Sequence, residues 1–140
     1  DGLHEIAGEG AGWGDDSAAL LFIAGIVARL PGQVLWVLRS RDLFAPGLYQ
    51  AGLDPARVIY AEARNDTEVL ALIEEGLRHR GLGAVVGEAR TVPMALTRRL
   101  QLAAEGGGTI ALLMRRPTRA DRDPFAVPSA ALTRWRVASA

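Results

Sequence analysis

The chain has 140 residues, 49% of them apolar, and its formal net charge is zero because 16 basic residues balance 16 acidic ones. This length suits one soluble domain and is short for two, and the absence of cysteine excludes disulfides and thiolate metal ligands. Every basic residue is an arginine, so no lysine can act as a phosphate clamp, Schiff-base former or general base.

Apolar periodicity and turn residues divide the chain into alternating strands and helices. In chain order, the patterns predict a strand at residues 3–7, a helix at 17–30, a buried strand at 34–38, a short helix at 44–51, a strand at 57–61, a helix from Asp66 or Thr67 to residue 80, a strand at 83–86, a helix at 93–105, a strand at 109–114, a polar loop at 115–128 and a final strand at 132–138. Asp15, Asp16 and Ser17 are candidate N-caps of the first long helix.

This alternation predicts an α/β fold, with a mostly parallel central sheet, helices on both faces and right-handed crossovers. The last strand alternates apolar and polar residues, so we expect it near an edge of the sheet and antiparallel to its neighbour. Ligands of such sheets lie beyond the carboxyl ends of the strands, and the glycine-rich segment at residues 8–16 follows the first strand there.

The stretch GEGAGWGDDSAALLFIAG, residues 8–25, has the layout of a phosphate-binding loop that leads into a helix. A P-loop needs lysine and Ser or Thr after its last glycine, whereas Asp15 and Asp16 follow Gly14, and one residue too many separates Gly8 from Gly14. Carboxylates at a helix N-terminus satisfy its N–H groups themselves and repel a polyphosphate. We therefore interpret the stretch as a degenerate phosphate loop, which consists of Gly8, Gly10, Gly12, Gly14, Asp15, Asp16 and Ser17.

Few other residues suggest chemistry. His4 lies in the first predicted strand and His79 near a helix end, and neither has around it a carboxylate pattern typical of a metal site. Glu88 ends a buried strand near the expected ligand region, and alone it is better explained as a hydrogen-bonding partner of a loop than as a catalytic acid. No serine lies in a G-x-S-x-G context. We therefore expect no catalytic residue, metal or cofactor.

Four long stretches carry a resemblance to a known family: LHEIAGEGAGWGDDSAALLFIAGIVARL, VLWVLRSRDLFAPGLYQAGLDPARVIYAEARN, LGAVVGEA and TRRLQLAAEGGGTIALLMRR. Over nearly the whole chain, residues 2–137, they resemble the ImuA family of RecA-like SOS mutagenesis proteins. The segment LFAPGLYQAGLDPARVI is the most specific part. The resemblance implies that residues 1–140 form a single RecA-like core domain, a fragment or trimmed core of a longer chain.

The more distant resemblance to RecA locates an ATP site in which three parts are altered. The lysine and threonine of the phosphate loop correspond to Asp15 and Asp16, the glutamate that activates water corresponds to the RSR segment at residues 39–41, and the Walker B aspartate falls near Glu88, a displaced substitute. An ATPase needs all these groups to place Mg²⁺, phosphate and water. The resemblance therefore implies a RecA-like core that has lost its nucleotide function and is not an enzyme.

The family resemblance implies a cytoplasmic accessory protein of an SOS-induced, error-prone translesion DNA synthesis complex, which acts by protein–protein docking. Its expected partner is an ImuB-type homologue of Y-family polymerases. RecA and an error-prone DnaE-type polymerase are further candidates, as is a second copy of the chain, whereas contact with nucleic acid would be weak or indirect. The longest apolar run, residues 18–28, is far short of the ~20 residues that a membrane span needs, so no membrane partner is expected.

Two alternative functions stay open on the sequence. A SulA-like protein shares the RecA-like layout without ATP and would inhibit cell division by binding FtsZ, although the AGLDPAR turn favours ImuA. A nucleotide-binding ATPase with an atypical loop is the second alternative, and it would have to bind phosphate in spite of Asp15 and Asp16.

The loop at residues 115–128 carries a group of arginines in the topological place where RecA contacts DNA. The simpler interpretation is a solvated connector in which Asp121 and Asp123 cancel part of the charge. The alternative is a weak contact with single-stranded DNA or a partner, with Phe125 available for stacking. The candidate contact residues are Arg115, Arg116, Arg119 and Arg122.

Overall fold

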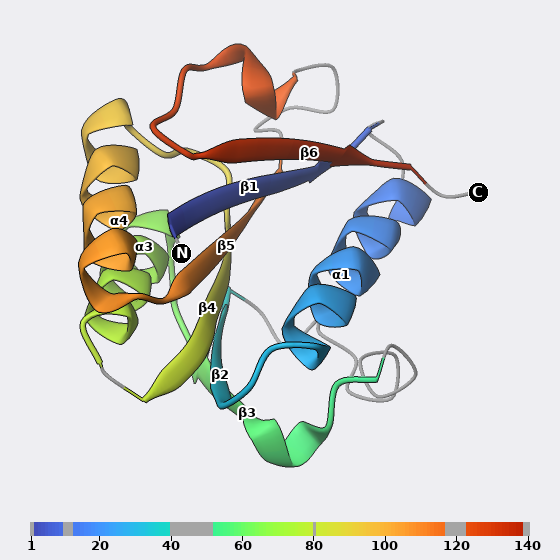
Figure 1. The fold of residues 1–140 in the computed structure, drawn as a ribbon. Helices are drawn as coiled ribbons and strands as arrows, with labels where there is room; N and C mark the ends of the chain where they lie inside the picture. Colours follow the sequence, from blue (N-terminus) through green and yellow to red (C-terminus); the bar gives the residue numbers. More distant parts are fainter. Residues whose placement is uncertain (1, 10–12, 40–51, 80, 117–122, 139–140) are drawn as a thin grey trace.

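The computed structural model describes residues 2–9, 13–39, 52–79, 81–116 and 123–138, and a parallel sheet runs through its centre (Figure 1). Its strands are ordered β3-β2-β4-β5-β1-β6, and every neighbouring pair is parallel. The strands are β1 (Gly2–Gly8), β2 (Gln33–Leu38), β3 (Val58–Glu62), β4 (Leu82–Ala89), β5 (Ile110–Arg115) and β6 (Thr133–Val137). The predicted α/β fold is confirmed.

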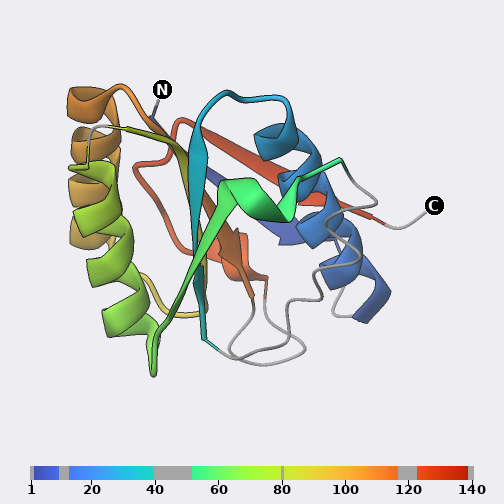
Figure 2. The same ribbon diagram turned by 90° about the horizontal axis from the view of Figure 1, so that it is seen from below.

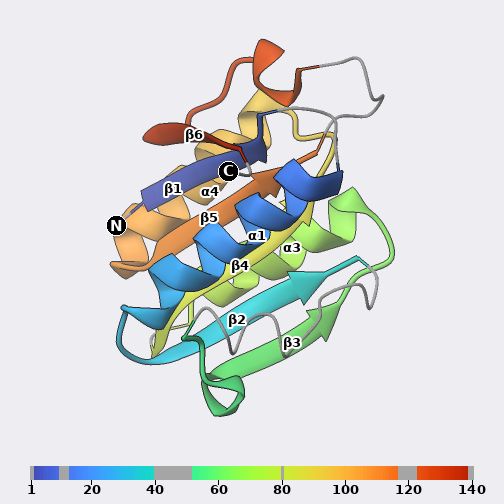
Figure 3. The ribbon, with the colours of Figure 1, turned by 90° about the vertical axis from the view of Figure 1, so that its right-hand side faces the viewer.

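Helices cover both faces of this sheet (Figures 2 and 3). α3 (Asp66–Leu77) and α4 (Met94–Gly107) lie side by side on one face, and α1 (Trp13–Ala28) lies on the other. Successive side chains of a strand point to opposite faces. Leu3 of β1 accordingly joins the core under α3 and α4, whereas Ile6 joins the core under α1.

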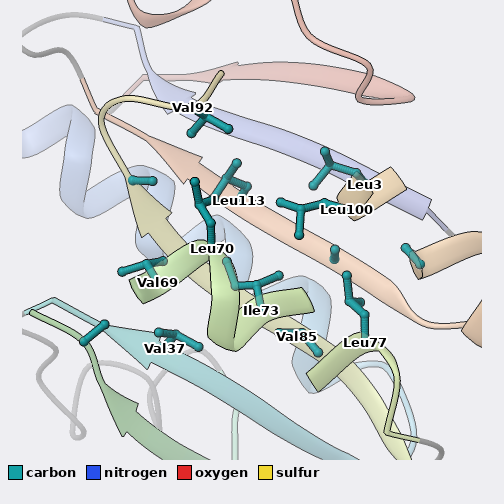
Figure 4. Packing of buried hydrophobic residues seen from close by; sticks show 14 residues of the cluster. Leu3, Val37, Val69, Leu70, Ile73, Leu77, Val85, Val92, Leu100 and Leu113 are labelled. Carbon is teal, nitrogen blue, oxygen red and sulfur yellow. The ribbon is translucent and has the colours of Figure 1, made fainter. Parts of the chain in front are cut away.

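The core between α3, α4 and the sheet consists of aliphatic side chains that repeat at helical spacing (Figure 4). Val69 and Ile73 of α3 are buried on one stripe of the helix and pack in the same cluster as Val85 of β4. α3 approaches β4 closely because Gly87 has no side chain: a Cβ there would lie 2.4 Å from Cδ1 of Ile73. Gly87, which lies in β4 one residue beyond the predicted strand, is thus explained by close packing between helix and sheet.

The N-cap of α3 differs from the sequence prediction. Asn65 is the cap, because its side-chain oxygen accepts a hydrogen bond from the backbone N–H of Glu68 at 2.9 Å. Asp66 and Thr67 lie one and two residues further along, inside the first turn. Acidic side chains are favoured throughout a first turn by the helix dipole, so an acidic residue alone does not mark the cap.

α1 begins at Trp13, four residues before the predicted start at Ser17. Asp15 and Asp16 therefore lie inside the first turn of the helix, and their prediction as N-caps was wrong for the same reason as in α3. Residues 10–12 and the side chains of residues 13–16 lie outside the described part of the structure. That these carboxylates accept hydrogen bonds from N–H groups of the first turn stays a prediction.

β6 lies at an edge of the sheet, as predicted, but runs parallel to β1 rather than antiparallel. The alternation of residues along β6 reports that one face is exposed, which is true of an edge strand of either direction. The direction is set instead by the connection from β5, which is long enough to return to the opposite end of the sheet. That connection includes a short 3₁₀ turn, η2 (Pro124–Ala126).

The remaining helix predictions concern residues 44–51, 66–80 and 93–105. The short helix at residues 44–51 lies outside the described residues. The other two correspond to α3 and α4, with ends that differ by one to three residues. None of the helices in the described ranges combines the length and apolarity required to cross a bilayer.

Candidate functional site

The degenerate phosphate loop lies at the carboxyl end of β1, where the strand ends at Gly8 and α1 begins at Trp13. The backbone N–H of Glu9, the first residue after the strand, donates a hydrogen bond to the carbonyl oxygen of Val137 at 2.8 Å. This donor therefore extends the pairing between β1 and β6 and is not directed at a ligand. The predicted role of the remaining loop residues, Gly10, Gly12, Gly14, Asp15, Asp16 and Ser17, stays a prediction.

An ion pair lies just beyond the carboxyl end of β2, in the segment that the sequence analysis matched to the water-activating glutamate of RecA. Nη1 of Arg39 is 3.2 Å from Oδ1 of Asp66, with side chains 35% and 20% exposed. The second oxygen of this carboxylate accepts the backbone N–H of Thr91 at 2.9 Å. The side chain of Arg39 is thus engaged by a carboxylate, and its correspondence to the water-activating group of RecA stays a prediction.

A second ion pair lies at the carboxyl end of β4, near which the sequence analysis located the Walker B carboxylate, and that correspondence stays a prediction. Nε of Arg116 is 3.0 Å from Oε1 of Glu88, and both side chains are about three-quarters buried, with 24% and 26% exposed. An arginine at this distance neutralises the carboxylate and competes with a metal ion for its oxygens. Within the described ranges, no group of three or more histidine, aspartate or glutamate side chains is placed to hold a metal ion.

Arg115 does not lie in the loop to which the sequence assigned it. It is the last residue of β5, is 2% exposed, and its Nη1 is 3.1 Å from Oε2 of Glu5. The structure therefore removes Arg115 from the set of side chains that could contact DNA or a partner. Arg116 is engaged with Glu88, as described above, while Arg119 and Arg122 lie outside the described residues.

Glu5 is a fully buried carboxylate that collects donors from three segments of the chain. Oε2 accepts from Arg115 of β5 at 3.1 Å and from the hydroxyl of Ser129 at 2.8 Å, and Oε1 accepts from Nε of Arg134 of β6 at 3.0 Å. Arg134 also donates to the carbonyl oxygen of Phe125 at 3.0 Å and lies over its ring. Through this cluster, side chains of the segment before β6 and of β6 itself are bonded to the carboxylate on β1, which also binds Arg115 of β5.

The position of Glu5 in the sequence already indicates a buried carboxylate. Glu5 and Leu3 are two residues apart in a strand, so they point to the same face, and Leu3 is part of the core. A carboxylate on a core-facing position needs a paired cation and further hydrogen bonds. The sequence predicts that such a cation exists, but the spacing gives no indication of which arginine supplies it.

The AGLDPAR segment closes the carboxyl end of α1. Asp54 caps a short 3₁₀ turn, η1 (Pro55–Arg57), by accepting the N–H of Ala56 at 2.9 Å. The guanidinium of Arg57 then donates to the carbonyl oxygens of Ala28 at 3.2 Å, Leu30, and Gly32 at 2.9 Å. A cation that satisfies the last carbonyls of a helix stabilises its end. The fold thus explains the described part of the most specific segment, residues 52–59, while residues 43–51 lie outside the described residues.

Among the described residues, three ionisable groups have pKa values displaced by their surroundings, but these groups do not form a common site. Burial lowers the pKa of His4, whose Nδ1 lies 2.6 Å from Oγ1 of Thr133. Hydrogen bonds from Arg136 and from the backbone N–H of Phe125 lower the pKa of Asp123. Burial raises the pKa of Tyr60 on the edge strand β3. Each of these shifts has a local structural cause.

No protein-family model matches the chain. The chain is, however, 42% identical over 147 residues to protein ImuA from two strains of Caulobacter vibrioides, in an alignment that covers 99% of this chain and 60% of those proteins. This match supports assignment of the chain to the ImuA family. The chain thus spans less than two thirds of the length of the ImuA proteins that it matches.

The fold also has a solved counterpart. The crystal structure of SulA from Pseudomonas aeruginosa superposes with a TM-score of 0.67 and 24% sequence identity, over 81% of this chain and 97% of that one. At this identity the likeness shows a shared fold. This chain and SulA thus share one α/β architecture, and the fold alone does not distinguish their functions.

Proposed function

We propose that this chain is the RecA-like core of an accessory protein for SOS-associated mutagenesis, and that it acts by docking onto other proteins. The observation that carries the proposal is the 42% identity to ImuA over 99% of the chain. The alignment covers nearly the whole chain, so the proposal concerns the whole core and not one motif.

The proposed role is non-catalytic. Lysine is absent from the chain, Arg39 pairs with Asp66 at the position of the water-activating group, and Glu88 pairs with Arg116 at the position of the Walker B carboxylate. Each pair neutralises a carboxylate at the carboxyl end of the sheet, while phosphoryl transfer requires a bound cation and an oriented water at these positions.

The partners proposed for this core are those of an error-prone translesion complex: an ImuB-type homologue of Y-family polymerases first, then RecA and a DnaE-type polymerase. A RecA-like core has surfaces with which protomers of that fold stack, and these surfaces remain suitable for docking when catalysis has been lost. Contact with DNA would then be indirect, through the partner.

A binding experiment with defined proteins tests this proposal. The purified chain is immobilised and offered an ImuB-type protein, RecA, a DnaE-type polymerase and FtsZ, each purified and at the same concentration. We expect retention of the ImuB-type protein and none of FtsZ. Retention of FtsZ alone would contradict the proposal and support the SulA-like alternative.

A separate experiment tests the proposal that the chain does not bind a nucleotide. Isothermal titration with Mg-ATP, and in a second arm with NADP, should give no binding heat, because Asp15 and Asp16 replace the phosphate-binding side chains. Micromolar affinity for either nucleotide would contradict this part of the proposal and favour an atypical nucleotide-binding protein.

A further inference from the structure

A groove with a volume of about 470 Å³ runs between the carboxyl-terminal halves of α3 and α4. Both helices lie side by side on the face of the sheet opposite α1 (Figures 1 and 2). Each of them leads into the start of a strand, so the groove lies near the amino ends of the strands. It is therefore remote from the degenerate phosphate loop, which follows the carboxyl end of β1.

The rim of the groove carries more positive than negative charge. Nη2 of Arg78 and Nη2 of Arg99 both contact the same oxygen of Glu74, at 2.6 and 2.9 Å. The two arginine side chains are 70% and 60% exposed, whereas that of Glu74 is 13% exposed. A guanidinium has five N–H donors, so one shared carboxylate oxygen leaves several donors of each arginine directed to solvent. An incoming carboxylate could bind both cations.

The same groove has an apolar side. Leu102 of α4 is 68% exposed and lies beside Ala103 in the lining. A single exposed leucine is ordinary on a protein surface, but here it borders a hollow and two cations. The groove thus offers an apolar contact and a charged contact within one short stretch of α4.

Gly106 keeps this hollow open. Glycine inside a helix is unfavourable relative to alanine, so a packing reason is expected for it. At Gly107 such a reason exists, because a Cβ would lie 2.5 Å from the carbonyl oxygen of Leu77. At Gly106 a Cβ would meet no atom within 4 Å. The internal packing of the described residues therefore does not require glycine at this position, whereas an occupant of the groove would.

We propose that the groove binds a short segment of a partner protein in which a carboxylate side chain neighbours an apolar one. The carboxylate binds Arg78 and Arg99, and the apolar side chain lies against Leu102 over Gly106. The inference rests on the proposed function in that the chain acts by docking. A peptide fits better than single-stranded DNA, because Leu102 gives an apolar contact beside the two arginines that a phosphate backbone cannot use.

A peptide titration followed by ¹⁵N NMR tests the inference. The probes are a capped peptide of sequence Asp-Leu-Leu-Glu-Leu and its uncharged counterpart Asn-Leu-Leu-Gln-Leu. We expect the acidic peptide to shift the amide signals of the groove helices with a dissociation constant below ~1 mM, and the uncharged peptide to bind on the order of tenfold more weakly. Equal binding of both peptides, no binding of either, or shifts confined to other elements would overturn the inference.

Three variants locate the binding. Gly106→Leu occupies the hollow and should abolish the shifts while the Tm does not fall, since a Cβ at this position meets no atom within 4 Å and the glycine is unfavourable in a helix. Arg99→Gln should weaken the acidic peptide about tenfold. Arg98→Gln is the matched control, because Arg98 is exposed on the same helix but does not line the groove, and it should bind as the parent does. Equal losses in both arginine variants, or unchanged binding in Gly106→Leu, would contradict the inference.

Two further results separate this inference from the proposed function. A thymidine oligonucleotide that shifts the same amide signals more strongly than the acidic peptide would overturn the assignment to a protein partner. If the parent chain retains the ImuB-type protein and Gly106→Leu retains it equally, while the peptide also fails to bind, the groove assignment is wrong and the proposed function stands. If the peptide binds as expected but no translesion partner is retained, the proposed function fails and the groove assignment stands.

Discussion

Substitution of Glu5 by glutamine should destabilise the fold more than any exchange of a surface charge. Glutamine has nearly the same size and removes only the negative charge. Glu5 is 0% exposed and Arg115 is 2% exposed, and their ion pair of 3.1 Å is accompanied by a second one from Arg134. Without the carboxylate, the guanidinium of Arg115 is left buried with no compensating charge at Glu5.

The expected cost follows from that burial. Removal of one partner of a buried ion pair costs about 3–5 kcal/mol, because the other charge stays desolvated. Since domains of this size have unfolding free energies of about 5–15 kcal/mol, the loss would be a large fraction of the total. Replacement of both partners by apolar residues, Glu5→Leu with Arg115→Met, should recover part of the loss, because no charge then remains buried in this pair.

Urea unfolding measures this cost. Trp36 is 2% exposed, so tryptophan fluorescence reports the loss of the core, and circular dichroism gives an independent signal. The matched control is Glu68→Gln, which breaks a surface pair with Arg64, whose side chain is 89% exposed, and should cost less than ~1 kcal/mol. If Glu5→Gln cost no more than the control, the cluster would not have the structural role assigned to it here.

Three further predictions concern other parts of the fold. Arg57→Gln should lower the free energy of unfolding in urea by about 2 kcal/mol, because it removes a charged donor from the end of α1. Arg29→Gln, a change of an exposed arginine at the same end, should change the free energy of unfolding by less than ~0.5 kcal/mol. Equal effects of the two substitutions would contradict the role of Arg57 at the end of the helix. Gly87→Ala should cost about 1–3 kcal/mol by overpacking against α3, and Gly106→Ala should cost nothing, which thermal unfolding measures. Burial lowers the pKa of His4 below its ordinary value of 6.5, so the unfolded chain binds a proton at mildly acidic pH before the folded chain does. The free energy of unfolding should therefore fall as the pH decreases below about 6.5. The substitution His4→Gln should reduce that fall.

The strands, helices and layering of the fold could be predicted from the sequence because they depend on local patterns. The apolar run of β2 and the stripe of Val69 and Ile73 in α3 are each contained in a few consecutive residues. The direction of β6 could not be predicted in this way, since it depends on the path of a long connection. The caps of α1 and α3 were misplaced because Asn65 and its acidic neighbours are all suitable helix-start residues.

For the candidate site, the sequence could predict only which nucleotide-binding side chains are missing. The absence of lysine and the aspartates after Gly14 are visible in the sequence, and so is the arginine at position 39. The pairing of Arg115 with Glu5 joins residues 110 positions apart, and no local pattern encodes such a distance. Arg115 was therefore grouped with the exposed arginines that follow it, although the strand continues through it.

The place of β1 in the sheet has a consequence for how the chain reaches its native state. β1 pairs with β5 from residue 110 and with β6 from residue 133, so the earliest strand has both of its neighbours in the last third of the sequence. During synthesis, Leu3 and Ile6 stay without sheet partners until most of the chain has left the ribosome. Contacts between residues so far apart in the sequence form slowly. Until they form, the exposed apolar residues of β1 can associate with other chains and cause aggregation. β1 can take its place between β5 and β6 only after both strands have been synthesised, and the carboxylate of Glu5 can contact both Arg115 and Arg134 no earlier than that.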